Sequence, residues 1–345
     1  MKRTSQKTAR IDVVDFWRFF AAIMILLCHI DLIGGNDHHL EYFVEFFFFL
    51  TGFFIFKHFQ KTPYFRHNIE ARAKNALAYT WKRFVALMPY VIPIVAITSL
   101  VVFTIGYSQD HWTGNFVNNM RNVINEILLL PSGVMSHARI IGPVWYLSVM
   151  IFAMPLVSLI AQSRRLNLFV VAMLPIIWLI LQQPNLLTYY SVNSHFSFYR
   201  GLFAMSLGGV IYYLTKIISA KKVPDITRRF LTFLEISLYI YAAIIGYFNL
   251  KPVELCIVVL FFAALITLSG ISLTSKLRTK LFNYAGAISL PLFMWHFGVI
   301  RIMIAAGINF GARVNIILMA ILSIFISAIH YQVVQKLIAR RTKKK

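Results

Sequence analysis

Long apolar segments separated by short polar ones form the main pattern of this chain. Ten of them approach the roughly 20 apolar residues that an α-helix needs to cross the hydrocarbon core of a bilayer. Their expected limits are 12–32, 42–59, 84–106, 143–161, 166–182, 198–217, 230–249, 252–272, 284–306 and 313–335. Pro89 and Pro93 are expected to break the third segment. The pattern predicts an all-α polytopic membrane protein, a bundle of about ten transmembrane helices.

Composition supports a membrane protein. It excludes a soluble two-domain protein, which the length of 345 residues would suggest, and a nucleic-acid-binding protein, which the charge would suggest. With 59% hydrophobic and 13% charged residues, the chain is too apolar for two soluble domains. Its net charge of +22 could indicate nucleic acid, but the basic residues form short clusters between apolar segments. That distribution is typical of topology signals, so we expect the lipid bilayer and no nucleic acid as partner. Residues 1–345 are expected to form one domain.

The positions of the basic residues predict an orientation. With the N-terminus inside, 27 of the 34 Lys and Arg residues fall in the inner segments and four in the outer loops. Cytoplasmic segments of membrane proteins carry such an excess, so both termini are expected in the cytoplasm. The basic start leads into 12–32 without a small-residue cleavage site, which indicates an uncleaved signal anchor. Cys28 and Cys256 both lie in apolar segments, so no disulfide framework is expected.

The first span carries two polar residues on one face. Arg18 and His29 are eleven residues apart, which in an α-helix means about 16 Å along the axis and only about 20° around it. An arginine near the middle of a span costs roughly 2.5–3.5 kcal/mol on insertion scales and therefore normally faces protein or a polar cavity. Asp15 precedes Arg18 by three residues and can orient it. The first span is expected to form one wall of a polar cleft.

The second span begins on the outer side with an acid. Glu45 lies about one turn into this span, and His29 lies about one turn before the outer end of the first. Consecutive spans are antiparallel neighbours, so the two side chains could meet. The alternative is an interfacial acid that reaches water, and the sequence favours neither. Gly52, further along the span, is expected to allow close helix approach.

Three polar segments have interpretations that do not require a function. The basic inner loop 57–83 is explained by orientation, although a polyanionic cytosolic cofactor would need the same charges. The long outer loop 107–142 contains 123–132, which is expected to be an interfacial or re-entrant helix. His38 and His39 follow Asp37, but nothing around them has metal-ligand spacing. We expect a solvated loop there and no metal site.

These residues together resemble the acyltransferase 3 family, integral-membrane enzymes that acylate sugars and other envelope molecules. The likeness covers nearly the whole chain. It is carried by Asp15, Arg18 and His29 in the first span; Glu45, Thr51 and Gly52 in the second; Lys82, Arg83 and Pro89 at the third; Trp145 to Ser148 in the fourth; and Ser289, Trp295 and His296 in the ninth. Two positions depart from the family pattern: Met150 replaces a frequent glutamate, and Leu290 a frequent tyrosine. The first departure favours the single-domain branch without an appended extracellular esterase-like domain.

The resemblance implies an O-acyltransferase of the bacterial cytoplasmic (inner) membrane. Its donor would be cytosolic acyl-CoA, most simply acetyl-CoA, with succinyl-CoA as an alternative. The acceptor would be a hydroxyl of an extracytoplasmic envelope glycan or lipid-linked sugar. Arg18, with Asp15 and Arg83, is expected to hold the donor, because a guanidinium matches phosphate and carbonyl oxygens.

The resemblance also implies roles in acyl transfer for residues near the outer side of the membrane. His29 is expected to act as general base toward the acceptor, oriented by Glu45. Further candidates for substrate or oxyanion contacts are His296, Trp145, Arg200 and Ser289.

Two functions from other classes remain open. A transporter for a glycan or a small acid would also need polar residues inside the membrane. Many transporters consist of two related halves with paired broken spans. The proline-bearing spans of this chain show no such symmetry, which weighs modestly against transport. A non-catalytic partner in a polysaccharide export complex is the second alternative.

The charge asymmetry generates a prediction of topology. Reporters fused after Lys61, Arg165, Lys222, Arg278 or Lys345 should report cytoplasm, and fusions after Asp37, Asn118 or Asn193 should report the exterior. The measurement is the activity of a paired cytoplasmic and periplasmic reporter. A cytoplasmic result at Asn118 would contradict the ten-span topology from the third span onward.

Overall fold

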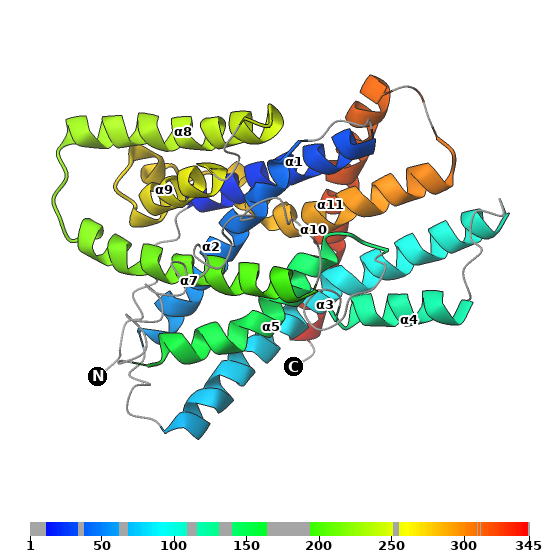
Figure 1. The fold of residues 1–345 in the computed structure, drawn as a ribbon, viewed down its shortest axis with the longest axis horizontal. Coiled ribbons are helices and arrows are strands. Elements are labelled where there is room, and N and C mark those ends of the chain that lie inside the picture. Colours follow the sequence, from blue (N-terminus) through cyan, green and yellow to red (C-terminus); the bar gives the residue numbers. More distant parts are fainter. Residues whose placement is uncertain are drawn as a thin grey trace.

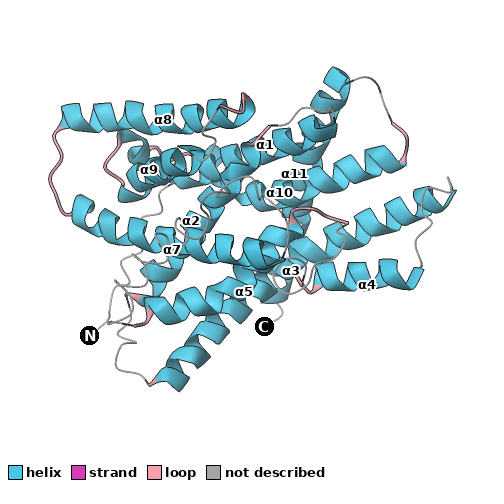
Figure 2. Cartoon of the chain, in the orientation of Figure 1, coloured by secondary structure: helices cyan, strands magenta, loops and turns pink. Residues whose placement is uncertain are grey.

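A computed structural model describes residues 12–33, 38–61, 68–108, 116–130, 140–163, 194–250, 255–308, 310 and 312–343. Within these ranges every regular element is a helix, as predicted (Figure 2). The elements are α1 Asp12–Ile33, η1 Leu40–Tyr42, α2 Phe43–Phe59, α3 Ile69–Ser108, α4 Phe116–Ile127, α5 Val144–Ala161, α7 Ser194–Ser219, α8 Asp225–Tyr247, α9 Leu255–Ser269, η3 Leu273–Lys276, α10 Lys280–Ala305 and α11 Ala312–Lys343.

Seven of the described helices are long and apolar enough to cross a membrane: α1, α3, α5, α7, α8, α10 and α11. Two more predicted spans correspond to shorter helices, α2 with 17 residues and α9 with 15. The predicted fifth span, 166–182, lies outside the described residues. These helices indicate a multi-pass membrane protein. The count of ten transmembrane helices and the cytoplasmic placement of both termini stay predictions.

The basic segment 57–83 is not the loop that the sequence analysis expected. Helix α3 begins at Ile69 and runs for 40 residues, so 69–83 form its first turns. Asn68 starts the helix, because its side-chain oxygen accepts the backbone N–H of Ala71 at 2.8 Å. The following residues are mostly alanine, arginine, lysine and glutamate, which are good helix formers. The prediction failed because charge was taken as a sign of loop, although these residues favour helix.

The expected break at the two prolines is also absent, since α3 continues through Pro89 and Pro93. Proline has no backbone N–H, so the carbonyl of Pro89 loses the donor that residue 93 would supply in a regular helix. His330 of α11 compensates, with its Nε2 atom 3.1 Å from the Pro89 oxygen. A neighbouring helix thus supplies the missing hydrogen bond and allows α3 to stay continuous.

Helix α2 crosses the middle of the bundle and contacts α1, α5, α7 and α9 (Figure 1). Its closest crossing is with α7. A Cβ atom at Gly52 would lie 1.9 Å from the carbonyl oxygen of Met205, and one at Gly208 would lie 2.2 Å from the carbonyl oxygen of Phe49. The two backbones touch, which only glycine allows. The predicted close approach at Gly52 is confirmed.

The long outer loop contains α4, which overlaps the expected interfacial segment 123–132 but begins seven residues earlier. Glu126 in its last turn is fully buried. Its Oε1 atom accepts the backbone N–H groups of Ile140 and Ile141 at 2.5 and 3.1 Å. These two residues lie a few positions before α5, so the Glu126 carboxylate fixes the segment that leads into the helix that carries Trp145.

Candidate functional site

The arginine predicted for the first span lies in an ion pair on α1, which packs against α10 and α2. Arg18 Nη1 lies 3.2 Å from Asp15 Oδ1, and the side chains are 33% and 7% exposed. Gly286 of α10 makes room for this pair, because a Cβ there would lie 2.2 Å from the Asp15 Cβ. The predicted contact between Asp15 and Arg18 is present, and it directs the guanidinium toward the space between the helices.

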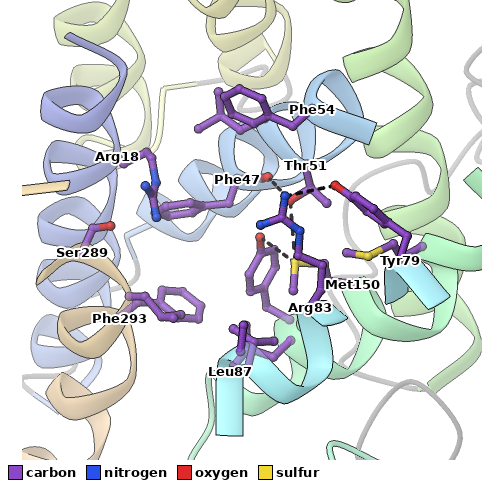
Figure 3. A pocket seen from close by; sticks show the side chains of 16 residues that line it. Arg18, Phe47, Thr51, Phe54, Tyr79, Arg83, Leu87, Met150, Ser289 and Phe293 are labelled. Atoms are coloured by element: carbon purple, nitrogen blue, oxygen red, sulfur yellow. Dashed lines mark hydrogen bonds between the residues drawn. The ribbon is translucent and has the colours of Figure 1, made fainter. Parts of the chain in front are cut away.

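A cavity of about 510 Å³ opens in front of Arg18, between α1, α2, α3, α5 and α10 (Figure 3). Three of the predicted site residues line it: Arg18, Arg83 and Ser289. The other lining residues are mostly apolar: Phe47, Leu50, Thr51, Phe54, Tyr79, Ala86, Leu87, Tyr146, Leu147, Met150, Met154, Leu290 and Phe293. A pocket with apolar walls and a few convergent polar groups is the usual form of a small-molecule site.

The two arginines reach the cavity from different helices, and both keep hydrogen-bond donors available. Arg83 Nη2 donates to the Tyr79 hydroxyl at 3.1 Å, and its guanidinium lies 5.2 Å from the centre of the Tyr79 ring. In the described part of the chain, Asp15 is the sole hydrogen-bond partner of the Arg18 guanidinium. Because a guanidinium has five N–H donors, most of them can serve a bound oxygen anion or carbonyl.

Met150, one of the departures from the family pattern, lies at the cavity wall. Its sulfur atom is 3.6 Å from the Thr51 hydroxyl and 3.6 Å from the Tyr146 hydroxyl. A thioether is a weak acceptor, so these contacts are weaker than those a glutamate at 150 would make. Leu290, the second departure, also lines the cavity. With Met150 in place of the frequent glutamate, the described lining of this cavity holds no acidic side chain.

Three aromatic rings of the lining form a cluster. The ring centres of Phe47, Tyr146 and Phe293 lie 5.4–6.0 Å from one another. The Phe293 ring is also 6.1 Å from that of His296. Since His29 and His296 are not among the lining residues, Phe293 has the cavity on one side and the histidine pair on another.

The two histidines meet, and their surroundings define which nitrogen carries the proton. His296 Nδ1 lies 3.1 Å from the Leu292 carbonyl oxygen, and His29 Nδ1 lies 2.9 Å from that of Ile25. A carbonyl only accepts, so each neutral ring carries its proton on Nδ1. His296 Nε2 is then an acceptor, 3.2 Å from His29 Nδ1. The Nε2 atom of His29 keeps its lone pair and has no hydrogen-bond partner among the described residues.

Glu45 contacts neither His29 nor water, so both interpretations of its sequence position are wrong. Its side chain is 1% exposed, and its Oε1 atom accepts a hydrogen bond from Arg200 Nε of α7. The Arg200 guanidinium also lies 5.1 Å from the centre of the Trp145 ring. Three residues that the sequence analysis named separately thus form one cluster. A guanidinium is a stronger partner for a buried carboxylate than a neutral imidazole, which explains the correction.

The acid beside His29 is Glu41, which the sequence analysis missed. Its carboxylate accepts hydrogen bonds from His39 Nδ1 at 3.1 Å and Cys28 Sγ at 3.2 Å, and its charge acts on the His29 ring. Burial acts to raise the pKa of Glu41, but these hydrogen bonds outweigh it and hold the pKa below the usual value. His38 is held by the Tyr247 carbonyl. His38 and His39 are therefore packed against neighbouring residues rather than solvated; Asp37 lies outside the described residues.

A second missed acid lies behind α1. Glu235 of α8 is fully buried and accepts hydrogen bonds from Trp17 Nε1 at 3.0 Å and from the hydroxyls of Thr267 and Thr274 at 2.7 Å each. This carboxylate holds Trp17, the neighbour of Arg18. Its signal was in the sequence, because an acid inside a predicted span usually has a defined partner.

The last predicted residue, Ser289, lines the cavity but donates its hydroxyl to the Gly286 carbonyl at 2.7 Å. No group of three or more His, Cys, Asp and Glu side chains in the described part of the chain could hold a metal ion.

Comparison with known protein families decides what kind of protein has this site. A family model described as an acyltransferase domain, that of acyltransferase 3, matches residues 11–332. The chain belongs to the acyltransferase 3 family. It is therefore a membrane acyltransferase, and the resemblance carried by Arg18 and His29 is confirmed at the level of the family. No curated protein and no solved structure matches the chain significantly.

The pairing of Glu45 with Arg200 generates a prediction of stability. Glu45→Gln removes the carboxylate from Arg200, whose side chain is 15% exposed, and the about 3–5 kcal/mol that breaking a fully buried ion pair costs is the upper limit for this pair. In detergent, the purified variant should therefore have an unfolding temperature several degrees below that of wild type, measured by thermal unfolding. Glu70→Gln, at an exposed acid of α3, is the matched control and should unfold with wild type. Unchanged unfolding of Glu45→Gln would contradict the assignment.

Proposed function

We propose that this membrane acyltransferase moves an acyl group, most simply acetyl, from acyl-CoA in the cytosol to a hydroxyl of an envelope sugar on the other side of the membrane. The observation that carries the proposal is the separation of two functional groups along α1. Arg18 borders a cavity, and His29, about 16 Å further along the same face, presents a free Nε2 atom. The two ends suit a donor and an acceptor that occupy opposite sides of the membrane.

The cavity suits the pantetheine arm and acyl group of the donor. Its volume of about 510 Å³ lies within the 300–1,000 Å³ usual for small-molecule pockets. Its walls match an alkyl arm, while Arg18 and Arg83 can donate to amide carbonyls or a phosphate. The nucleotide would stay at the basic end of the bundle, where Lys57 Nζ lies 5.9 Å from the ring centre of the lining residue Phe54 and Lys82 precedes the lining residue Arg83.

His29 Nε2 is proposed to remove the proton from the acceptor hydroxyl. The resulting oxygen nucleophile attacks the thioester carbonyl carbon, a C–O bond forms, the C–S bond breaks, and the CoA thiolate takes up the proton from the imidazolium. His296 accepts the Nδ1 proton of His29 in a hydrogen bond and so keeps Nε2 basic. In this proposal His296 is a positioning residue rather than an oxyanion donor. The thioester reaches His29 past Phe293, which contacts both the cavity and His296.

The cluster of Glu45, Arg200 and Trp145 is proposed to shape the acceptor side. Glu45 and Trp145 come from the first turns of α2 and α5, and Arg200 comes from the second turn of α7. Their mutual contacts hold three helix ends together beside the aromatic cluster, since Phe48 contacts both Trp145 and Tyr146. Glu45 therefore contributes by holding the site together and not as the partner of the base. The acceptor is an envelope glycan or a lipid-linked sugar.

Donor binding by purified protein tests the proposal. If Arg18 holds the donor, Arg18→Ala and Arg18→Lys should each weaken acetyl-CoA binding, since an ammonium does not reproduce the guanidinium fork. Charged hydrogen bonds contribute about 1.5–3 kcal/mol, so the dissociation constant should rise at least tenfold. Arg121→Ala, at an exposed arginine of α4, is the matched control and should bind like wild type.

Equal affinities for wild type and Arg18→Ala would contradict the role of Arg18. The transfer itself is followed by mass spectrometry of envelope glycans with and without the gene. Loss of an acetyl-sized mass increment supports the proposal, a succinyl-sized one changes the donor, and unchanged glycan masses would contradict acylation of an envelope glycan.

A further inference from the structure

A second cavity, of about 670 Å³, opens on the face of the bundle where α3, α10 and α11 meet. It is separate from the donor cavity and shares no lining residue with it. Side chains of α3 and α11 form its two walls, and those at the rim are about half exposed. The lining residues are Val85, Met88, Pro89, Ile92, Pro93, Ile97, Trp295, Ile326, Ile329, His330, Val333, Val334, Leu337, Ile338 and Arg341.

The floor of this groove has polar groups, but they satisfy one another. Trp295 Nε1 donates to His330 Nδ1 at 2.9 Å, and His330 Nε2 donates to the Pro89 carbonyl at 3.1 Å. That carbonyl is available because Pro93 has no N–H. Both nitrogens of His330 and the indole N–H are therefore used, and the floor offers little to a polar ligand. The groove accordingly suits a hydrocarbon chain rather than a sugar or a pantetheine arm.

The length of the groove matches that of one acyl chain. From Ile326 to Arg341 a helix rises about 22 Å, and from Val85 to Ile97 about 18 Å. Half of the hydrocarbon core is about 15 Å thick, so the groove has the length of one leaflet. An extended hydrocarbon chain therefore matches the groove from the Arg341 end to the Ile97 and Ile326 end.

The charge at one end selects the head group. Arg341 is the only charged residue among the described lining residues, and it lies at the C-terminal end of α11. Lys336 and Arg340 lie nearby on the same exposed part of the helix. The other end of the groove, at Ile97 and Ile326, is apolar. A molecule that fits has one anionic end and a hydrocarbon tail.

We propose that this groove binds an acyl chain of an anionic phospholipid, with the lipid phosphate at Arg341. On the predicted topology the lipid belongs to the cytoplasmic leaflet, in which anionic head groups attract basic residues near the membrane surface. The bound chain packs against α3, which carries Arg83, and against α10, which carries His296. The inference does not depend on the proposed donor or acceptor.

Native mass spectrometry of the purified full-length protein tests the site. Phosphatidylglycerol and phosphatidylcholine with the same acyl chains are added in detergent, and the bound lipid is counted. Wild type should retain phosphatidylglycerol about fivefold more strongly than phosphatidylcholine, the ratio expected for one additional basic contact. Arg341→Ala should lose this preference. Arg340→Ala removes the same charge one position away, outside the groove, and should keep it.

A second pair of variants tests the chain-binding part. Val333→Trp fills the groove and should release both lipids, whereas Ile321→Trp, at an exposed position of α11 outside the groove, should retain them. The proposal would be overturned by equal retention of the two lipids in wild type, or by equal retention in Val333→Trp and Ile321→Trp. Dimers that disappear only in Val333→Trp would overturn it as well, because a second copy of the chain would then occupy the groove.

Discussion

The hydrogen bond between His29 and His296 is the interaction on which the account of this site depends. Two imidazoles side by side inside a membrane bundle, His296 fully buried and His29 partly exposed, must divide the donors and acceptors of their contact between them, because an unmatched buried polar atom costs free energy. The carbonyl groups of Ile25 and Leu292, each four residues earlier on its own helix, place both Nδ1 protons. The only arrangement left gives His29 a free Nε2 lone pair. A base is thus prepared by helix geometry, without a hydrogen bond from His29 to an acid in the described part of the chain.

The rest of the bundle holds the helices that carry this pair and the donor cavity. Gly286 lets α1 and α10 approach at Asp15, which orients Arg18. His330 joins α10 to α3 through Trp295 and the Pro89 carbonyl. Each junction uses a feature that would weaken an isolated helix, either a glycine or a proline, and a neighbouring helix compensates for it.

The sequence predicted the features that depend on local spacing and missed those that depend on tertiary contacts. The face shared by Arg18 and His29, the contact of Asp15 with Arg18 and the close approach at Gly52 follow from helix periodicity. The partner of Glu45 could not be predicted, because Arg200 is 155 residues away and its helix had no known neighbour. The meeting of His29 with His296, 267 residues apart, depended on the packing of α1 against α10 in the same way. Helix α3 was mispredicted at two places. Its start was missed because the helix propensity of the basic segment was overlooked. Its continuity through the prolines could not be predicted, because the compensating hydrogen bond comes from His330, far away in the sequence.

The most direct test of the central claim replaces His296 by residues that do or do not accept a hydrogen bond. In cells that lack the wild-type gene, glycan acylation is measured by mass spectrometry, with acetyl-CoA binding as the control for folding. His296→Gln provides an oxygen near the place of Nε2 and should keep much of the activity. His296→Leu provides no acceptor and should lower acylation with donor binding unchanged, by less than the about 10²–10⁴-fold that general base catalysis contributes, because the Ile25 carbonyl still accepts from His29 Nδ1. Acylation by His296→Leu at the wild-type rate would contradict the account.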